Sequence, residues 1–109
     1  MTVRYEVSPE ALDDIDAVAA FLAESNGATA ERFIDAVYRA FDRLAANPHL
    51  GHARPDLTSL PVFFWTVLKR YAVIYRKAEP LQIVRVLPWR RDVATLLNAE
   101  RGPPARRPR

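Results

Sequence analysis

The sequence predicts a single α+β domain in which a helical hairpin packs across one face of a curled antiparallel sheet. The expected order of elements is β-α-α-β-β-β, with a closing helix. Apolar residues recur at helical spacing in the first half of the chain, and three short apolar runs follow one another closely in the second half. A chain of 109 residues has room for one hydrophobic core but not for two. We therefore expect residues 1–100 to form one domain.

The first elements are a short strand and an amphipathic helix. Apolar and polar residues alternate over residues 2–7, which is typical of a half-buried strand. Ser8 and Pro9 have the residue types preferred at an N-cap and at the first helical position. A helix is therefore predicted over residues 9–24, with an apolar stripe at Leu12, Ile15, Ala19 and Leu22.

A second helix is predicted over residues 28–46, with Phe33, Val37, Phe41 and Leu44 on one face. The short link between the two helices favours an antiparallel hairpin. Asn47-Pro48 ends the second helix, because the residue before proline disfavours helical geometry. Residues 48–61 carry several turn signals and are predicted to form an ordered loop.

Three strands are predicted over residues 62–68, 71–77 and 81–87. Their connections are too short for a crossover helix, so we expect an antiparallel meander. A terminal helix is expected over residues 91–99. Residues 101–109 are rich in proline and arginine, and we expect a basic, disordered tail there.

The composition limits the compartment and the chemistry. The chain contains no cysteine, which excludes disulfides and thiolate metal sites. No apolar run approaches the roughly 18 residues of a membrane span, and the start of the chain lacks the apolar segment of a secretory signal. We therefore expect a cytoplasmic protein with no membrane partner.

Charge is distributed unevenly along the chain. Residues 1–68 hold five basic and ten acidic residues, whereas residues 69–109 hold eleven basic and three acidic residues. A basic C-terminal half attracts nucleic acid or an acidic protein segment.

Three motifs in a fixed order resemble a known family. The loop Asn47–Leu57 has the pattern N-P-x-x-G-x-x-R-x-D-L, Tyr71 and Tyr75 form a Y-x-x-x-Y strand, and Val86–Asp92 closes with V-L-x-x-R-R-D. Together they resemble the ParE branch of the RelE/ParE toxins of bacterial toxin–antitoxin systems, and the resemblance covers about residues 3–98.

The resemblance implies a RelE/ParE-like fold and the toxin of a type II module of the kind that stabilises plasmids. Such a toxin inhibits DNA gyrase by binding. Its partner is a small antitoxin whose acidic C-terminal segment wraps the hairpin and sheet, which implies a hetero-oligomer.

The mRNA-cutting branch of the superfamily makes different demands. RNA cleavage needs a base, an acid and cations for the phosphorane. The stretch from Trp89 to Leu97, which resembles the catalytic end of those relatives, has no tyrosine or histidine. We therefore expect no catalytic residue and no cofactor. The alternatives are a ribosome-dependent endonuclease, with Lys69, Arg70 and Arg85 as its cations, and a non-toxic remnant that only binds antitoxin.

Two groups of residues are candidates for binding. Tryptophan and arginine are enriched in binding hot spots, and adjacent arginines can pair with carboxylates or phosphates. The candidates for contact with target or antitoxin are Arg54, Arg70, Arg85, Trp89, Arg90 and Arg91. The candidates for an antitoxin groove on the hairpin are Leu12, Ile15, Val37 and Phe41.

Some of these candidates also have purely structural interpretations. Internal pairing of Arg54 with Asp56 is favoured over contact with a partner. Arg85 shares a predicted strand face with Leu81, Ile83 and Leu87, and lies either at the solvent edge of the sheet or in a groove that receives a partner. Arg90 and Arg91 form either a binding site or an exposed turn in which Arg91 pairs with Asp92.

Other side chains are expected to be structural. His49 and His52 lie near Asp56, but a loop with prolines is a poor frame for a metal or an acid–base pair, so no metal site is expected. Tyr71 and Tyr75 share a strand face. Core positions with satisfied hydroxyls are favoured over platforms for stacking bases.

Overall fold

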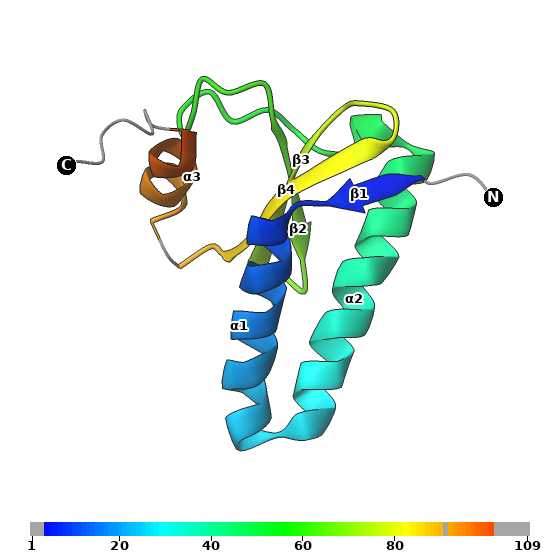
Figure 1. Cartoon of the computed structure of the whole chain (residues 1–109), viewed down its shortest axis with the longest axis vertical. Coiled ribbons are helices and arrows are strands. Elements are labelled where there is room, and N and C mark those ends of the chain that lie inside the picture. The colour runs from blue at the N-terminus through cyan, green and yellow to red at the C-terminus, as the bar shows by residue number, and fades with distance from the viewer. Residues whose placement is uncertain (1–3, 91, 102–109) are drawn as a thin grey trace.

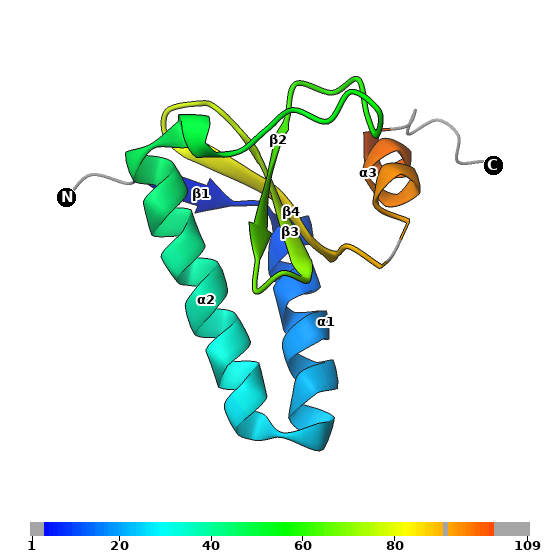
Figure 2. The same cartoon turned by 180° about the vertical axis from the view of Figure 1, so that it is seen from behind.

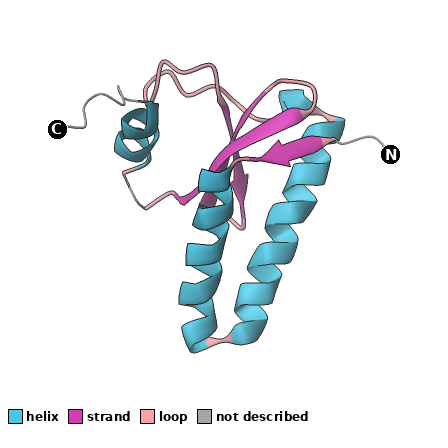
Figure 3. Cartoon of the chain, in the orientation of Figure 1, coloured by secondary structure: helices cyan, strands magenta, loops and turns pink. Residues whose placement is uncertain are grey.

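The computed structural model describes residues 4–90 and 92–101, and it confirms the predicted α+β class. A helical hairpin covers one face of a four-stranded sheet, and a short helix packs on the other face (Figures 1 and 3). Seen from behind, the hairpin extends well beyond the sheet (Figure 2). The elements are β1 (Tyr5–Val7), α1 (Pro9–Ser25), α2 (Gly27–Ala46), a 3₁₀ turn (Pro48–Leu50), β2 (Phe63–Val67), β3 (Tyr71–Arg76), β4 (Leu81–Pro88) and α3 (Val93–Arg101).

Both helices of the hairpin begin at a capping side chain. The Ser8 hydroxyl accepts a hydrogen bond from the Ala11 N–H at 3.0 Å and donates one to the Val84 carbonyl at 2.8 Å. It therefore starts α1 and fixes that start to β4. The Asn26 side chain accepts a hydrogen bond from the Ala28 N–H at 2.9 Å and so caps α2. Asn26 is also the single residue between α1 and α2.

The sheet has the strand order β1-β4-β3-β2. β2, β3 and β4 form the predicted antiparallel meander, but β1 pairs with β4 in parallel, so the sheet is mixed rather than wholly antiparallel. The prediction was incomplete here because a short turn fixes an antiparallel pairing, whereas β1 and β4 are separated by most of the domain.

The turn between β2 and β3 starts one residue earlier than predicted. Leu68 and Lys69 have φ values of 54° and 60°, and the Arg70 N–H donates to the Val67 carbonyl at 3.1 Å. Sequence reasoning placed this turn at Lys69 and Arg70 because leucine seldom adopts positive φ.

A β-bulge changes the side-chain alternation of β4. Ile74 pairs with Arg85 and Tyr75 pairs with Ile83, which leaves Val84 as the extra residue. Leu81 and Ile83 therefore pack with the hairpin core, whereas Leu87 packs in the opposite core. The predicted common face of Leu81, Ile83, Arg85 and Leu87 is wrong, because strict alternation does not hold across a bulge.

The sheet separates two apolar cores. The larger core lies between the sheet and the hairpin and includes Phe33, Phe41 and Tyr75, each fully buried. The smaller core lies between the sheet and α3 and includes Phe64 and Leu97. Burying one such large side chain contributes about 1.5–3 kcal/mol to folding. The position of α3 therefore depends on a few contacts in the smaller core.

Candidate interaction surface

The Tyr75 side chain joins two of the three sequence motifs, the loop Asn47–Leu57 and the strand with Tyr71 and Tyr75, into one structural unit. Its hydroxyl donates to the Pro48 carbonyl at 2.6 Å and accepts from the Gly51 N–H at 2.8 Å. Burial raises the pKa of Tyr75, which keeps the phenol in its neutral, donating form. Tyr71 also belongs to the core, where its ring packs edge to face with Phe33. Both tyrosines thus take the structural positions predicted for them.

Arg54 is paired within its own loop. Its guanidinium makes two hydrogen bonds to the Asp56 carboxylate, at 2.9 and 2.8 Å. This pairing lowers the pKa of Asp56 and raises that of Arg54. The predicted internal pairing is confirmed. The guanidinium also lies 5.5 Å from the centroid of the Trp89 ring, so the loop and the end of β4 meet at this point.

Trp89 is anchored by its neighbours in the sheet. Its ring stacks on Phe64 with a centroid separation of 5.8 Å, and its indole N–H donates to the Thr66 hydroxyl at 3.1 Å. The ring is nevertheless only partly buried. Trp89 therefore has a fixed position at the end of β4, with only part of its ring accessible, and the exposed Arg90 follows it.

Arg85 lies at the sheet edge, where it pairs with α1. Its guanidinium contacts the two carboxylate oxygens of Asp14 at 2.7 and 2.8 Å. The same carboxylate accepts from the Val86 N–H at 3.0 Å. β1 pairs only with Leu81–Ile83, so Asp14 covers the edge of β4 beyond β1. Of the two predicted placements for Arg85, the structure supports the edge, with Asp14 rather than solvent as its partner.

An open cleft of about 420 Å³ lies between the second half of α1 and the ends of β3 and β4. It contains Phe21, the most exposed large apolar residue described, with 70 % of its surface accessible. Two exposed arginines from the predicted set, Arg70 and Arg90, also line it. The other lining residues are Ala17, Val18, Leu22, Tyr71 and Pro88. The cleft thus combines an apolar helix face with two cations from separate turns.

Three of the four predicted groove residues are inaccessible. Ile15, Val37 and Phe41 are at most 4 % exposed and pack against the sheet. The prediction was wrong for these three residues, because the apolar stripe with the clearest helical periodicity packs into the core and does not form an exposed groove. Leu12 is 44 % exposed, but it does not line the cleft. Phe21 was missed, although a large aromatic residue beside the core stripe is a signal for an exposed apolar patch.

Arg91 lies outside the described residues, so its predicted pairing with Asp92 has no structural description. Asp92 itself caps α3. Its carboxylate accepts from the Thr95 N–H at 3.1 Å and from the Thr95 hydroxyl at 2.6 Å, and these bonds lower its pKa.

The two histidines of the loop after α2, His49 and His52, make contacts within the fold. The backbone of His52 pairs with Phe64 in both directions, and His49 Nδ1 lies 3.2 Å from Lys77 Nζ. Within the described ranges, no group of three His, Cys, Asp or Glu side chains is placed to hold a metal ion. No helix in the described part of the chain is long and apolar enough to cross a membrane.

Comparisons with known proteins agree with this fold. A family model described as the ParE toxin of the type II toxin–antitoxin system parDE matches residues 5–93. A solved structure titled "Chromosomal ParDE TA system from P. aeruginosa" matches with a TM-score of 0.65 and 19 % identity, covering 80 % of this chain and 96 % of that one. At this identity the likeness shows the fold alone. No curated protein sequence matches the chain.

Proposed function

Because the chain belongs to the ParE toxin family of type II toxin–antitoxin systems, we propose that it inhibits DNA gyrase and is neutralised by a cognate antitoxin. The match over residues 5–93 carries this proposal, because it includes the hairpin, the whole sheet and the end of β4. The proposed site of action is the cytoplasm, where gyrase acts.

Inhibition by binding, rather than by catalysis, fits the chemistry at the end of β4. The side chains described there are an anchored indole, exposed arginine and a capping carboxylate. Tyr75, the nearest tyrosine in the sequence, is buried, and its hydroxyl is engaged by Pro48 and Gly51. The ring of Tyr71, which pairs with Pro88, packs on Phe33 in the core. The endonuclease alternative relies on Arg85 as a cation, yet that charge is paired with Asp14.

The cleft beside α1 supports a proposal for antitoxin binding. An amphipathic acidic segment would place apolar side chains against Phe21 and Leu22 and carboxylates against Arg70 and Arg90. The resulting complex is a hetero-oligomer. We propose that Trp89 and Arg90 contact the target, and occupation of the cleft would then also cover Arg90.

A supercoiling assay tests the gyrase proposal. Purified chain is added to gyrase, ATP and relaxed plasmid, and we expect loss of supercoiling and accumulation of cleaved DNA, both reversed by the product of the neighbouring gene. Arg90→Ala is expected to weaken inhibition about tenfold, the effect of losing one hot-spot contact of about 1.4 kcal/mol. Arg76→Ala is the control for loss of positive charge, because Arg76 is also exposed but belongs to β3.

Unchanged supercoiling and cleavage at a large molar excess of folded chain would contradict the proposal. Codon-phased cuts in translated mRNA after induction would instead identify the endonuclease alternative. Harmless expression at verified soluble levels would identify a remnant that only binds antitoxin.

A further inference from the structure

One surface outside the cleft combines cations with two aromatic rings that pack, partly buried, against the hairpin core. On the edge strand β2, the rings of Phe63 and Trp65 are both partly accessible. The Arg43 guanidinium lies 5.6 Å from the Trp65 ring centroid, and Lys77 Nζ lies 4.0 Å from that of Phe63. Each ring therefore has a cation over its face.

The arginines of α2 extend this surface along the helix. At 3.6 residues per turn, Arg32, Arg39 and Arg43 fall within an arc of about 40° and span roughly 16 Å. The contact between Arg43 and Trp65 sets that arc on the β2 side of the helix. We call the set of Arg32, Arg39, Arg43, Phe63, Trp65 and Lys77 the aromatic–basic face.

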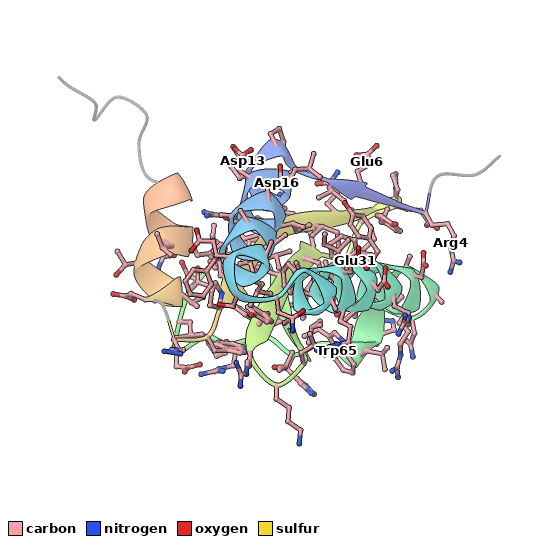
Figure 4. All side chains as sticks on the ribbon, turned by 90° about the horizontal axis from the view of Figure 1, so that it is seen from below. Arg4, Glu6, Asp13, Asp16, Glu31 and Trp65 are labelled. Carbon is pink, nitrogen blue, oxygen red and sulfur yellow. The ribbon has the colours of Figure 1, made fainter. Side chains whose placement is uncertain are left out.

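The acidic residues of α2 form a second row beside the arginines. Glu31, Asp35 and Asp42 are centred roughly 80° further round the helix, with Asp35 about 40° from Arg39. Figure 4 shows Glu6, Asp13 and Asp16 on the side of the molecule opposite Trp65. The two ion pairs found among the described residues join Arg54 to Asp56 and Arg85 to Asp14, so neither neutralises the aromatic–basic face.

We propose that the aromatic–basic face binds single-stranded nucleic acid. Phosphates would pair with the row of arginines and Lys77, and unpaired bases would pack against the parts of the Trp65 and Phe63 rings that Arg43, Lys77 and the core leave accessible. An acidic peptide would satisfy the cations but would leave the rings without a planar partner. Stacking and phosphate pairing do not involve the 2′-hydroxyl, so DNA and RNA of equal length are expected to bind alike. The proposal is independent of the gyrase target and of the antitoxin cleft.

Fluorescence anisotropy with labelled 20-mer oligo(dT) and the full chain tests the proposal. We expect saturable binding at 50 mM salt that weakens about fiftyfold at 200 mM salt, as four phosphate contacts, to the three arginines and Lys77, require. The double variant Arg39→Gln/Arg43→Gln should weaken binding more than tenfold and flatten the salt dependence. Arg70→Gln/Arg90→Gln removes the same charge from the cleft and should change affinity less than twofold.

The aromatic contribution is tested separately at Trp65. Trp65→Ala should weaken binding at least fivefold, whereas Trp65→Phe keeps a ring and should retain most of the affinity. Circular dichroism checks that each variant is folded. A 20-mer oligo(U) is expected to bind within about threefold of oligo(dT), because neither type of contact uses the 2′-hydroxyl.

Four results would overturn the proposal. These are no binding at 50 mM salt, equal losses in the two double arginine variants, displacement of the oligonucleotide by polyglutamate at equal charge concentration, and an effect confined to the C-terminal arginines. The last is measured with Arg106→Gln/Arg107→Gln/Arg109→Gln, which removes tail charge and leaves the aromatic–basic face intact.

Discussion

At the scale of single residues, Gly51 shows why the central loop motif requires glycine. A Cβ atom at this position would lie 2.5 Å from the Tyr75 hydroxyl oxygen and 2.9 Å from the Phe64 carbonyl oxygen. Real Cβ atoms do not approach other atoms so closely, and the carbonyl belongs to the sheet. The glycine is therefore needed for close approach, since the backbone of Gly51 does not have a positive φ.

Gly51→Ala is expected to destabilise the protein by about 1–3 kcal/mol, because either the loop or β2 must move. Thermal unfolding measures the effect, and a loss of 1 kcal/mol lowers Tm by roughly 4–8 °C in a domain of this size. Gly27→Ala is the matched control, because a Cβ there meets no atom within 4 Å. An equal loss in both variants would contradict the steric explanation.

The residue scale also shows what the sequence conceals. The charge and type of Arg54 and Arg85 were evident, and a nearby carboxylate correctly suggested the partner of Arg54. Asp14 lies 71 positions from Arg85, so no local pattern identifies that pair. The cleft could not be predicted for the same reason. Phe21, Arg70 and Arg90 are far apart in the sequence and come together only when α1 packs on the sheet.

At the scale of secondary-structure elements, both helices of the hairpin and the meander were predictable, because apolar periodicity and capping residues specify them locally. The bulge at Val84 was not predictable. It depends on how β4 fits between two cores and leaves no signature in an apolar run such as Leu81–Leu87. The direction of β1 was likewise decided by tertiary packing.

The turn between β2 and β3 contains residues that disfavour the backbone conformation found there. Leu68 and Lys69 both adopt positive φ, where residues with a Cβ other than Asn and Asp are strained. Leu68 is also 52 % exposed, so its side chain gains little from burial. The hydrogen-bonded pairing of β2 and β3 on either side of the turn compensates for this strain.

Leu68→Asn/Lys69→Gly is therefore expected to stabilise the protein by about 1–2 kcal/mol, because Asn-Gly favours positive φ at both positions. Urea denaturation measures the change as a higher midpoint with an unchanged slope. Ala78→Gly, in the β3–β4 connection and outside the positive-φ region, should destabilise slightly. A lower midpoint for the double variant would show that Leu68 or Lys69 makes a stabilising contact.

At the scale of the whole molecule, the two cationic surfaces occupy separate places. The cleft lies between α1 and the ends of β3 and β4, whereas the aromatic–basic face lies along α2 and the edge strand β2. Each includes arginine and an accessible aromatic ring, Phe21 in one and Trp65 in the other. If each surface has its own partner, charge changes on one should leave binding at the other intact.

This separation gives a reciprocal prediction for antitoxin binding. Arg70→Glu/Arg90→Glu should weaken the affinity for the antitoxin at least a hundredfold, because like charges would replace two proposed pairs with carboxylates. Arg39→Glu/Arg43→Glu imposes the same change in net charge and should alter that affinity less than threefold. Isothermal titration calorimetry with the antitoxin's C-terminal segment measures both. Similar losses in the two variants would mean that the antitoxin responds to overall charge, and a loss confined to Arg39→Glu/Arg43→Glu would move its site to the aromatic–basic face.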